Sequence, residues 1–388
     1  MSEAQRWGVA PRSALSATAV YTDVPEDRRA VSNAAMRCLS LSVIHMPPPT
    51  RVLIVKLGSL GDIVHAWPAY VALQAARPDW RLAWLVDPRW QPLVQPLPGL
   101  HDIFPFNTHS GPAAWRRAIA RLRQFDPHIA LDWQGAWKSS LLAWLSRAPR
   151  RLGLASGWLR EPGAHWFYTQ TIAPAGRHIS RQLLELAQQL APAAALRPMP
   201  GMISPADQAR AQAWLREREI QSFLFFSPGG GWRGKQWPRE RYLELGRRLM
   251  SLKNLAVVWN QDPGEPMPAL PAGFHTFQGD LPLLMALAAR ARLALGGDTG
   301  PLHLAAALGA PVVALFGPTD PERNRPWARH IRVLFHGRPA PAGQPAHGRY
   351  ARGKTPAPEL LAISVEAALA ACQDLLAASA PDFAEVTP

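Results

Sequence analysis

The feature that most constrains the fold is an alternation of short apolar runs with helix-like stretches, which occurs twice along the chain. In the first series, strands are expected at 52–55, 82–86 and 129–131, and helices near 67–76, 113–124 and 137–145. In the second, strands are expected at 223–227, 255–259, 293–295 and 312–316, and helices near 206–218, 239–251, 281–291 and 301–308. Such alternation is typical of parallel sheets joined by crossover helices. The sequence therefore predicts an α/β protein with two doubly wound domains and a ligand site in the cleft between them.

The 388 residues are enough for these two domains and three flanking segments. Residues 1–50 lack periodicity and end in three prolines, so a disordered leader or an upstream start is expected there. The domains are expected at 51–195 and 196–335, with a Pro- and Ala-rich linker at 191–205. A low-complexity basic segment, 336–358, is expected to be mobile, and a C-terminal helix is expected within 359–380.

The formal charge of +14 is a second constraint. A basic balance fits a nucleic-acid, anionic-membrane or acidic-substrate partner, but the abundance of Arg, Ala and Pro fits a bias in composition equally well. Only five lysines occur, so a lysine in a glycine-rich loop is of more interest than usual. The two cysteines, Cys38 and Cys372, argue against a disulfide framework or zinc site. No apolar run is long enough to span a membrane, and the N-terminus does not resemble a secretory signal.

The first candidate loop follows the strand at 52–55 and reads Gly58-Ser59-Leu60-Gly61-Asp62. Because a proline belongs in the first turn of a helix, Pro68 predicts a helix that begins near His65 and leaves Asp62 in the loop. Asp62 is then either a helix N-cap or a functional carboxylate. The glycine spacing matches neither the dinucleotide fingerprint nor the phosphate loop of nucleotide triphosphatases.

The second candidate loop, in "FFSPGGGWRGKQWP", places Gly230, Gly231 and Lys235 after a buried strand. Backbone N–H groups and one ammonium there suit a diphosphate, although a flexible turn with a solvated lysine fits the same pattern.

The third candidate loop runs from the strand at 293–295 into a helix expected to start at Pro301. The helix N-terminus behind Asp298, Thr299 and Gly300 suits an anion, and His303 in the first turn can face the same ligand. Alternatively, Asp298 or Thr299 is only a cap and His303 packs under the sheet. A second turn, 317–321, is expected to line the same cleft.

Five segments in order, "VKLGSLGD", "DWQGAWKS", "REPGAHWFYT", "PGGGWRGKQWP" and "GGDTGPLHLAAALGAPVVALFGPTDP", resemble glycosyltransferase family 9, the lipopolysaccharide heptosyltransferases. The resemblance covers residues 51–327, and the "REP" and "GPTDP" segments are most similar to heptosyltransferase I. It implies a GT-B fold, in which an acceptor-binding N-terminal and a nucleotide-sugar-binding C-terminal Rossmann-like domain face each other across a cleft. It also implies inverting transfer of heptose from ADP-L-glycero-D-manno-heptose to Kdo on lipid A.

The resemblance also implies roles for individual residues. Asp62 matches the general base, and Lys235 matches the lysine on the donor phosphates. The donor-binding set comprises Gly230, Gly231, Lys235, Glu265 (on the ribose), Asp298, Thr299, Gly300 and His303. The acceptor-side set comprises Ser59, Gly61, Gln134, Lys138 and Arg160. Gly230 and Gly231 depart from the hydroxylated residues of heptosyltransferase I, so the donor contacts differ there.

The expected partners follow from the same resemblance. The ADP-sugar is a substrate, and no metal or other cofactor is expected, because no metal cluster or Asp-x-Asp motif stands out. We expect a cytoplasmic enzyme peripheral to the inner membrane, steered to anionic lipid by arginines, and no nucleic-acid partner. These arginines are Arg116, Arg117, Arg121, Arg123 and Arg160. A non-catalytic nucleotide-sugar or polyanion-binding module is the alternative, and a Rossmann oxidoreductase is less favoured because its glycine fingerprint is absent.

Overall fold

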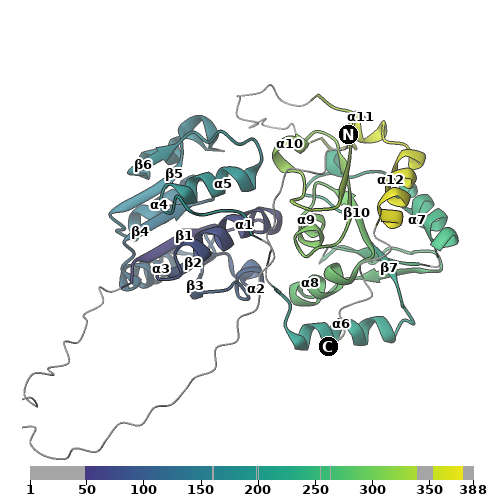
Figure 1. Ribbon diagram of the computed structural model, residues 1–388, viewed down its shortest axis with the longest axis horizontal. Helices are drawn as coiled ribbons and strands as arrows, with labels where there is room; N and C mark the ends of the chain where they lie inside the picture. The colour runs from purple at the N-terminus through teal and green to yellow at the C-terminus, as the bar shows by residue number, and fades with distance from the viewer. Residues whose placement is uncertain are drawn as a thin grey trace, which may run out of the picture. The chain divides into compact units, whose positions relative to one another are not determined.

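A computed structural model describes residues 49–159, 161–197, 199, 201–253, 255–262, 264–338 and 353–378. The first half of the chain forms a six-stranded parallel sheet with the order β3-β2-β1-β4-β5-β6 (Figure 1). Its strands are β1 (Arg51–Val55), β2 (Arg81–Val86), β3 (Leu100–Pro105), β4 (Ile129–Asp132), β5 (Arg150–Leu154) and β6 (Gln170–Ile172). Its helices are α1 (Leu60–Ala76), α2 (Gln91–Val94), α3 (Pro112–Phe125), α4 (Trp137–Leu145) and α5 (Ile179–Gln188), with 3-10 turns η2 (Pro88–Trp90), η3 (Ser156–Trp158) and η4 (Pro162–Phe167).

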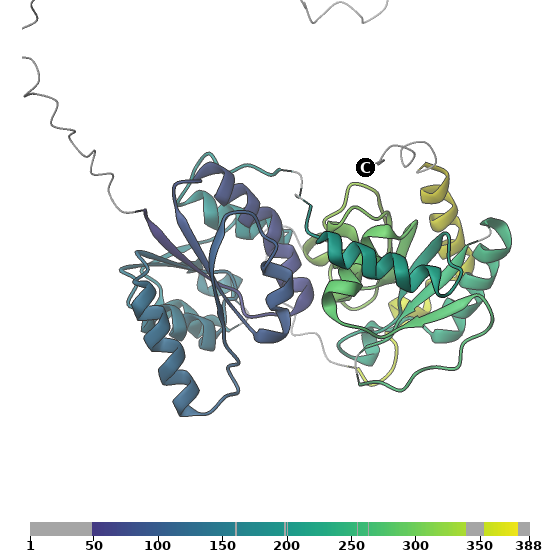
Figure 2. The same cartoon turned by 90° about the horizontal axis from the view of Figure 1, so that it is seen from below.

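The second half repeats this topology, with the parallel order β12-β11-β10-β7-β8-β9. Figure 2 shows the same ribbon from below. Its strands are β7 (Phe223–Ser227), β8 (Ala256–Asn260), β9 (Phe274–Phe277), β10 (Leu293–Gly297), β11 (Val312–Phe316) and β12 (Ile331–Phe335). Its helices are α6 (Pro205–Arg216), α7 (Arg239–Lys253), α8 (Leu281–Arg290), α9 (Gly300–Ala307), α10 (Pro321–Asn324), α11 (Pro358–Leu361) and α12 (Val365–Ala378), with the 3-10 turn η5 (Arg233–Lys235). Two Rossmann-type sheets with helices on both faces confirm the expected GT-B-type α/β fold.

Helices cover both faces of each sheet, which explains why the central strands read as continuous apolar runs. In β1, Leu53 and Val55 pack with α3 and α4, whereas Val52 and Ile54 point to the face covered by α1 and α5. In the second sheet, β7 alternates in the same way between α7 with α12 on one face and α8 with α9 on the other. The apolar cluster on the α8 and α9 face of this sheet is continuous with the cluster on the α1 and α5 face of the first sheet, so one apolar core joins the halves.

One element boundary that matters for the site was predicted wrongly. Helix α1 begins at Leu60, and Pro68 lies inside it rather than in its first turn. The N-cap is Ser59, so Asp62 is neither the N-cap nor a loop residue but belongs to the first turn. The reason is local: Ser59 and Asp62 bond to each other and begin the helix about five residues earlier than the proline suggests.

The end of the chain packs on the second half. The expected single C-terminal helix is two helices, α11 and α12. Most of the basic segment, residues 339–352, lies outside the described residues. Its last described part lies against η5, where the Gly234 N–H donates to Gly353 O at 3.3 Å and the Ala357 N–H donates to Gly234 O at 3.3 Å.

Candidate active site

The predicted loops lie where parallel sheets bind ligands. In each sheet the strand order reverses between two neighbouring strands, β1 and β4 in the first and β7 and β10 in the second. Ligands of doubly wound proteins bind beyond the carboxyl ends of the strands at such a reversal. The loops after β1, β7 and β10 carry Asp62, Lys235 and Asp298 respectively, so all three predicted motifs occupy switch points.

Asp62 is held by its own helix turn. Its Oδ2 accepts from the Ser59 backbone N–H at 3.0 Å and from the Ser59 hydroxyl at 3.2 Å, and the residue keeps partial exposure. Burial raises the pKa of Asp62, but the Lys56 ammonium, the Ser59 bonds and the Arg323 guanidinium together lower it below the ordinary value. Asp62 is therefore a structural cap partner and also an accessible, ionised carboxylate.

Two buried charges beneath Asp62 were not singled out in the sequence. The Lys56 ammonium is 3% exposed and donates to Trp133 O at 2.9 Å, and burial lowers its pKa. Asp132, at the end of β4, accepts from the Ser139 and Tyr168 hydroxyls at 2.8 and 2.7 Å. It also accepts from two backbone N–H groups of the loop that follows. In the sequence, the only sign of a role for Lys56 and Asp132 is that each lies at the end of a strand.

The acceptor-side candidates divide into framework and surface residues. Gln134 uses its Oε1 to accept from the N–H groups of Leu57 and Gly58 at 3.1 and 3.3 Å, so it braces the loop that carries Ser59. Lys138 is exposed on α4. Arg160 lies outside the described residues.

Asp298 organises the donor-side candidates. Its Oδ2 lies 2.5 Å from Lys235 Nζ, and its Oδ1 lies 3.0 Å from His303 Nε2. Burial raises the pKa of Asp298, but Lys235 and His303 outweigh it and hold the pKa well below the ordinary range. The Thr299 hydroxyl bonds to Ser227 Oγ at 2.9 Å, so neither Asp298 nor Thr299 uses its side chain to cap α9. Lys235 is thus a part-buried ammonium already paired with a carboxylate, not a solvated lysine.

The glycine loop before Lys235 is partly open. A Cβ on Gly231 would meet nothing within 4 Å, and one on Gly230 would make only ordinary contacts at 3.4 Å. A Cβ on Gly229 would lie 2.8 Å from Asp262 Oδ2, so the Asp262 carboxyl, whose pKa burial raises, borders this loop. Glu265 lies further out, where its Oε2 accepts from Gln261 Nε2 at 2.7 Å.

The first turns of α1 and α9 touch each other through two glycines. A Cβ on Gly61 would lie 3.0 Å from His303 Cδ2, and one on Gly300 would lie 2.9 Å from Leu60 Cβ. This contact brings the donor turn beside the turn that holds Asp62. Gly61 thus permits close helix packing, a role that the acceptor-side assignment did not include.

Buried histidines continue the same contact. The His65 ring on α1 lies 4.4 Å from the His303 ring and 5.4 Å from the His178 ring, centroid to centroid. His178 Nε2 donates to Arg325 O at 2.8 Å. Nearby, Arg177 pairs with Asp320, which caps α10, at 3.1 Å. These interactions hold α1 and α5 of the first half against α9 and the α10 region of the second.

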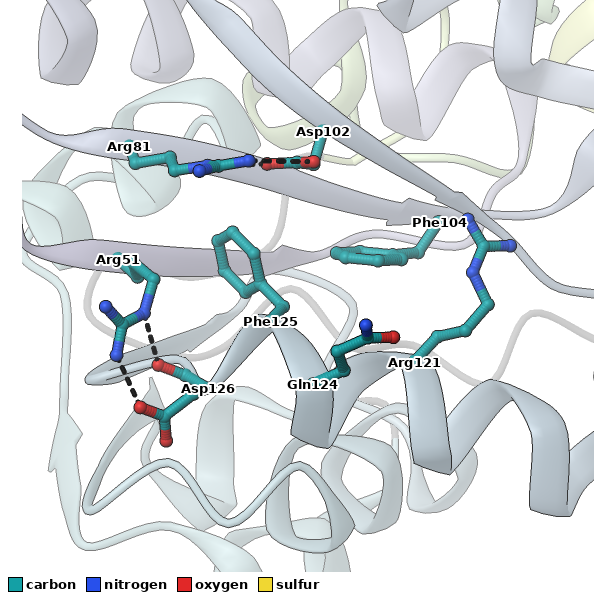
Figure 3. A pocket seen from close by; sticks show the side chains of 8 residues that line it. All are labelled: Arg51, Arg81, Asp102, Phe104, Arg121, Gln124, Phe125 and Asp126. Atoms are coloured by element: carbon teal, nitrogen blue, oxygen red, sulfur yellow. Dashed lines mark hydrogen bonds and ion pairs between the residues drawn. The ribbon is translucent and has the colours of Figure 1, made fainter.

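A cavity of about 600 Å³ lies elsewhere, at the amino-terminal ends of β1, β2 and β3 (Figure 3). Arg51 and Arg81 line it, paired with Asp126 and Asp102. Arg121 also lines it, with its guanidinium 5.5 Å from the centre of the Phe104 ring. This is the end of the sheet opposite the loops, so the candidate active site is not here.

The family model "Glycosyltransferase family 9 (heptosyltransferase)" matches residues 115–344. The chain belongs to glycosyltransferase family 9. It is 32% identical over 293 residues to lipopolysaccharide heptosyltransferase 1 of Pseudomonas aeruginosa, covering 70% of this chain and 79% of that protein. Membership of the family makes the protein a glycosyltransferase.

Solved structures share the fold of this family 9 enzyme. A family 9 glycosyl transferase from Veillonella parvula has a TM-score of 0.71 at 20% identity, covering 85% of this chain and 98% of that one. Heptosyltransferase WaaC of Escherichia coli, solved with ADP-2-deoxy-2-fluoro heptose, has a TM-score of 0.61 at 23% identity, with coverages of 84% and 99%.

The described residues contain neither a membrane-spanning helix nor a metal-binding group of side chains. In that part of the chain, no helix combines the length and apolar character needed to cross a bilayer. The same residues contain no group of three or more His, Cys, Asp or Glu side chains arranged to hold a metal ion.

Proposed function

We propose that the enzyme transfers heptose from ADP-L-glycero-D-manno-heptose to Kdo of the lipopolysaccharide inner core, with inversion at the anomeric carbon. The observation that carries this proposal is the ionised Asp62 carboxylate beside the α9 donor turn, at the paired switch points of a family 9 fold. The donor follows from the relatives, since the related WaaC was solved with an ADP-heptose analogue. A lipopolysaccharide acceptor is supported by the name of the Pseudomonas relative, lipopolysaccharide heptosyltransferase 1, and Kdo follows from the resemblance of the sequence to heptosyltransferase I.

In the proposed reaction, Asp62 removes the proton of an acceptor hydroxyl as the hydroxyl oxygen attacks the anomeric carbon. The bond from that carbon to the ADP oxygen breaks, and ADP departs with the electron pair. Attack opposite to the leaving group inverts the configuration. General-base assistance of this kind contributes roughly 10²–10⁴-fold to the rate.

The leaving diphosphate is assigned to the second half. Lys235 supplies the positive charge, and the N-terminus of α9, with Thr299 and Gly300, supplies backbone N–H groups and a favourable dipole. Because Lys235 is paired with Asp298 in the free enzyme, its net charge toward a ligand is small until the diphosphate replaces part of that pairing. Open space at Gly231 leaves room for the donor, and Glu265 is assigned to the ribose.

The acceptor is a lipid, so we place the enzyme in the cytoplasm at the inner membrane face, with the α3 arginines toward anionic headgroups. Arg116, Arg117, Arg121 and Arg123 are all exposed on α3. We propose no metal in the step; a full rate in EDTA is the expected result, and loss of rate restored by a divalent ion would contradict it.

The test pairs a donor screen with a variant of Asp62. ADP-, UDP- and GDP-sugars are offered with a truncated lipopolysaccharide acceptor, and the product is identified by mass. Asp62→Asn keeps an amide oxygen that can accept from Ser59, so folding and ADP affinity should persist while turnover falls by roughly 10²–10⁴-fold. Full activity of Asp62→Asn would leave Asp62 with its capping role only. Nucleotide-sugar binding with no ADP release in the presence of any acceptor would favour the non-catalytic alternative.

A further inference from the structure

Three tryptophans and a phenylalanine form an exposed aromatic cluster on α4 and η4, which we call the aromatic platform. Trp137, Trp144 and Trp166 are 42%, 50% and 71% exposed. The rings touch edge to face or tilted: Trp137 lies 5.6 Å from Trp166 and 5.8 Å from Phe167, and Trp144 lies 6.1 Å from Phe167, centroid to centroid. The contacts fix the rings relative to one another while leaving their outer edges in water.

Such a cluster is unusual on a water-facing surface. Among the described residues, eight large apolar side chains are exposed, and three of them belong to this one patch. Contiguous exposed apolar surface marks an interaction site. Tryptophan in particular is enriched where one side of the ring is apolar and the other is hydrated, as at the headgroup level of a bilayer.

The surface around the platform is strongly basic. Residues 112–159 contain eight cationic side chains and only two acids. Of the two acids, Asp126 is paired with Arg51 and Asp132 is buried. The cations are Arg116, Arg117, Arg121, Arg123, Lys138, Arg147, Arg150 and Arg151.

Hydrogen bonds tie two of these cations to α4 and η4, the elements that carry the platform. Arg151 Nε donates to Phe167 O at 2.8 Å, and Arg123 Nε on α3 donates to Leu145 O at the end of α4 at 3.0 Å. Helices α3 and α4 cover the same face of the first sheet, so their outer surfaces are continuous. An acid also lies at the platform: Glu161 Oε2 accepts from the Trp137 N–H at 2.7 Å, at the positive end of α4.

We propose that the aromatic platform and the cations of α3 and α4 dock the enzyme on an anionic lipid bilayer, with the tryptophan rings at headgroup depth. Two contributions hold proteins at a membrane surface. Aromatic rings insert between the headgroups, and cationic side chains pair with anionic lipid. The charge complementarity favours a membrane over a second copy of this chain, which would bring like charges together.

The platform also lies close to the site. Helix α4 starts three residues after Gln134, which braces the loop that bears Ser59, and follows β4 at the same sheet edge as Asp62. Docking would therefore bring a headgroup-level acceptor toward Asp62. This part of the inference rests on the proposed transfer reaction. Binding of the aromatic platform to a bilayer extends the proposed membrane placement and does not depend on that reaction.

The experiment measures binding of the full chain to vesicles that contain no acceptor, by co-sedimentation. One set is phosphatidylcholine alone, and the other is two parts phosphatidylcholine to one part phosphatidylglycerol. We expect binding to the second set that weakens as salt is raised. Trp144→Ser with Trp166→Ser should weaken it roughly tenfold. The matched control, Leu252→Ser with Met267→Ser, removes exposed apolar side chains from the second half and should change nothing.

A double arginine substitution tests the electrostatic contribution to bilayer binding. Arg147→Gln with Arg150→Gln should weaken binding by about fivefold for each arginine, whereas Arg216→Gln with Arg290→Gln, in exposed positions of the second half, should not. If a double tryptophan variant fails to fold, Trp166→Ser alone, at the most exposed ring, decides the point.

The outcomes separate the inference from the proposed function. Equal binding to both vesicle sets, or binding unaffected by the tryptophan variants, would overturn the inference. So would a dimer that the tryptophan variants dissociate, since the platform would then bind a second copy. A failure of the proposed function gives a different result. The wild type would then bind vesicles but transfer no sugar to any acceptor, including a water-soluble deacylated one. If both hold, the tryptophan variants lose activity only toward the vesicle-embedded acceptor.

Discussion

Acid should weaken the packing between the halves, and His178 makes the size of the effect predictable. This side chain is 7% exposed, its Nε2 donates to Arg325 O, and its Nδ1 accepts from the Ser180 N–H at 3.2 Å. A second ring proton would displace that N–H. Burial lowers the pKa of His178 to about 4, with His303, Arg323 and Arg325 opposing its protonation further.

The sign follows from where the proton binds. In the unfolded chain a histidine has a pKa near 6.5, so between about pH 6.5 and 4 the unfolded state binds a proton that the native state does not. Stability is complete above pH 6.5 and is lost as the pH falls toward 4. At pH 5 the loss from His178 is about 2 kcal/mol, since each pKa unit corresponds to about 1.4 kcal/mol. The pKa of His65 is lowered well below its ordinary value, chiefly by burial, so His65 adds a loss of the same sign.

The measurement is the free energy of unfolding from urea titrations at pH 7.5 and pH 5. His178→Gln cannot titrate but keeps an amide that can donate to Arg325 O. Its loss of stability between the two pH values should be smaller than that of the wild type by about 2 kcal/mol. The matched control is Asn107→Gln, at an exposed position without a titratable group, whose loss should equal the wild-type loss. Parallel losses in His178→Gln and the wild type would refute the reasoning.

Two further predictions concern the site. Lys56→Met removes the charge that most lowers the pKa of Asp62, so the acid limb of kcat/KM should move to higher pH; an unmoved limb in a folded variant would contradict this. Lys235→Met should weaken ADP affinity and turnover together, whereas Asp62→Asn should lower turnover alone. Calorimetry with ADP measures the affinity, and steady-state kinetics measure the turnover. Unchanged values of both would refute the assignment of Lys235 to the leaving group.

The central strands and their loops were predictable because they are buried on both faces. The bounds predicted for β7 and β11 match the observed strands to the residue, because no polar residue interrupts either apolar run. Four of the five strands that were missed, β3, β6, β9 and β12, are the outermost strands of the two sheets. Edge strands face water on one side and carry polar residues, as in "QTI" and "FHTF", which obscures the apolar pattern.

The site was predictable as a set of loops but not as a set of contacts. Asp62, Lys235 and Asp298 follow buried strands, so position along the chain identified them. The pairing of Lys235 with Asp298 joins residues 63 apart, and the influence of Arg323 on Asp62 joins the two halves. Neither of these two interactions leaves a periodic pattern in the sequence. The start of α1 was missed because Pro68 was weighted above the Ser59–Asp62 pair.

The lowered pKa of Asp62 also limits how it can act as a base. A general base is most effective when its pKa lies near the working pH, and that of Asp62 lies below the ordinary carboxyl value. If Asp62 is the base, as the proposed function has it, it accepts the acceptor proton only once that proton has become acidic, which happens as the new bond to the anomeric carbon forms. In the same proposal, its negative charge until then faces a carbon from which a diphosphate is departing and on which positive charge grows. On the proposed function, the charge of Lys56 and the hydrogen bonds from Ser59, which keep Asp62 ionised, favour early loss of ADP and late transfer of the proton, so the carboxylate contributes as a fixed charge before it contributes as a base.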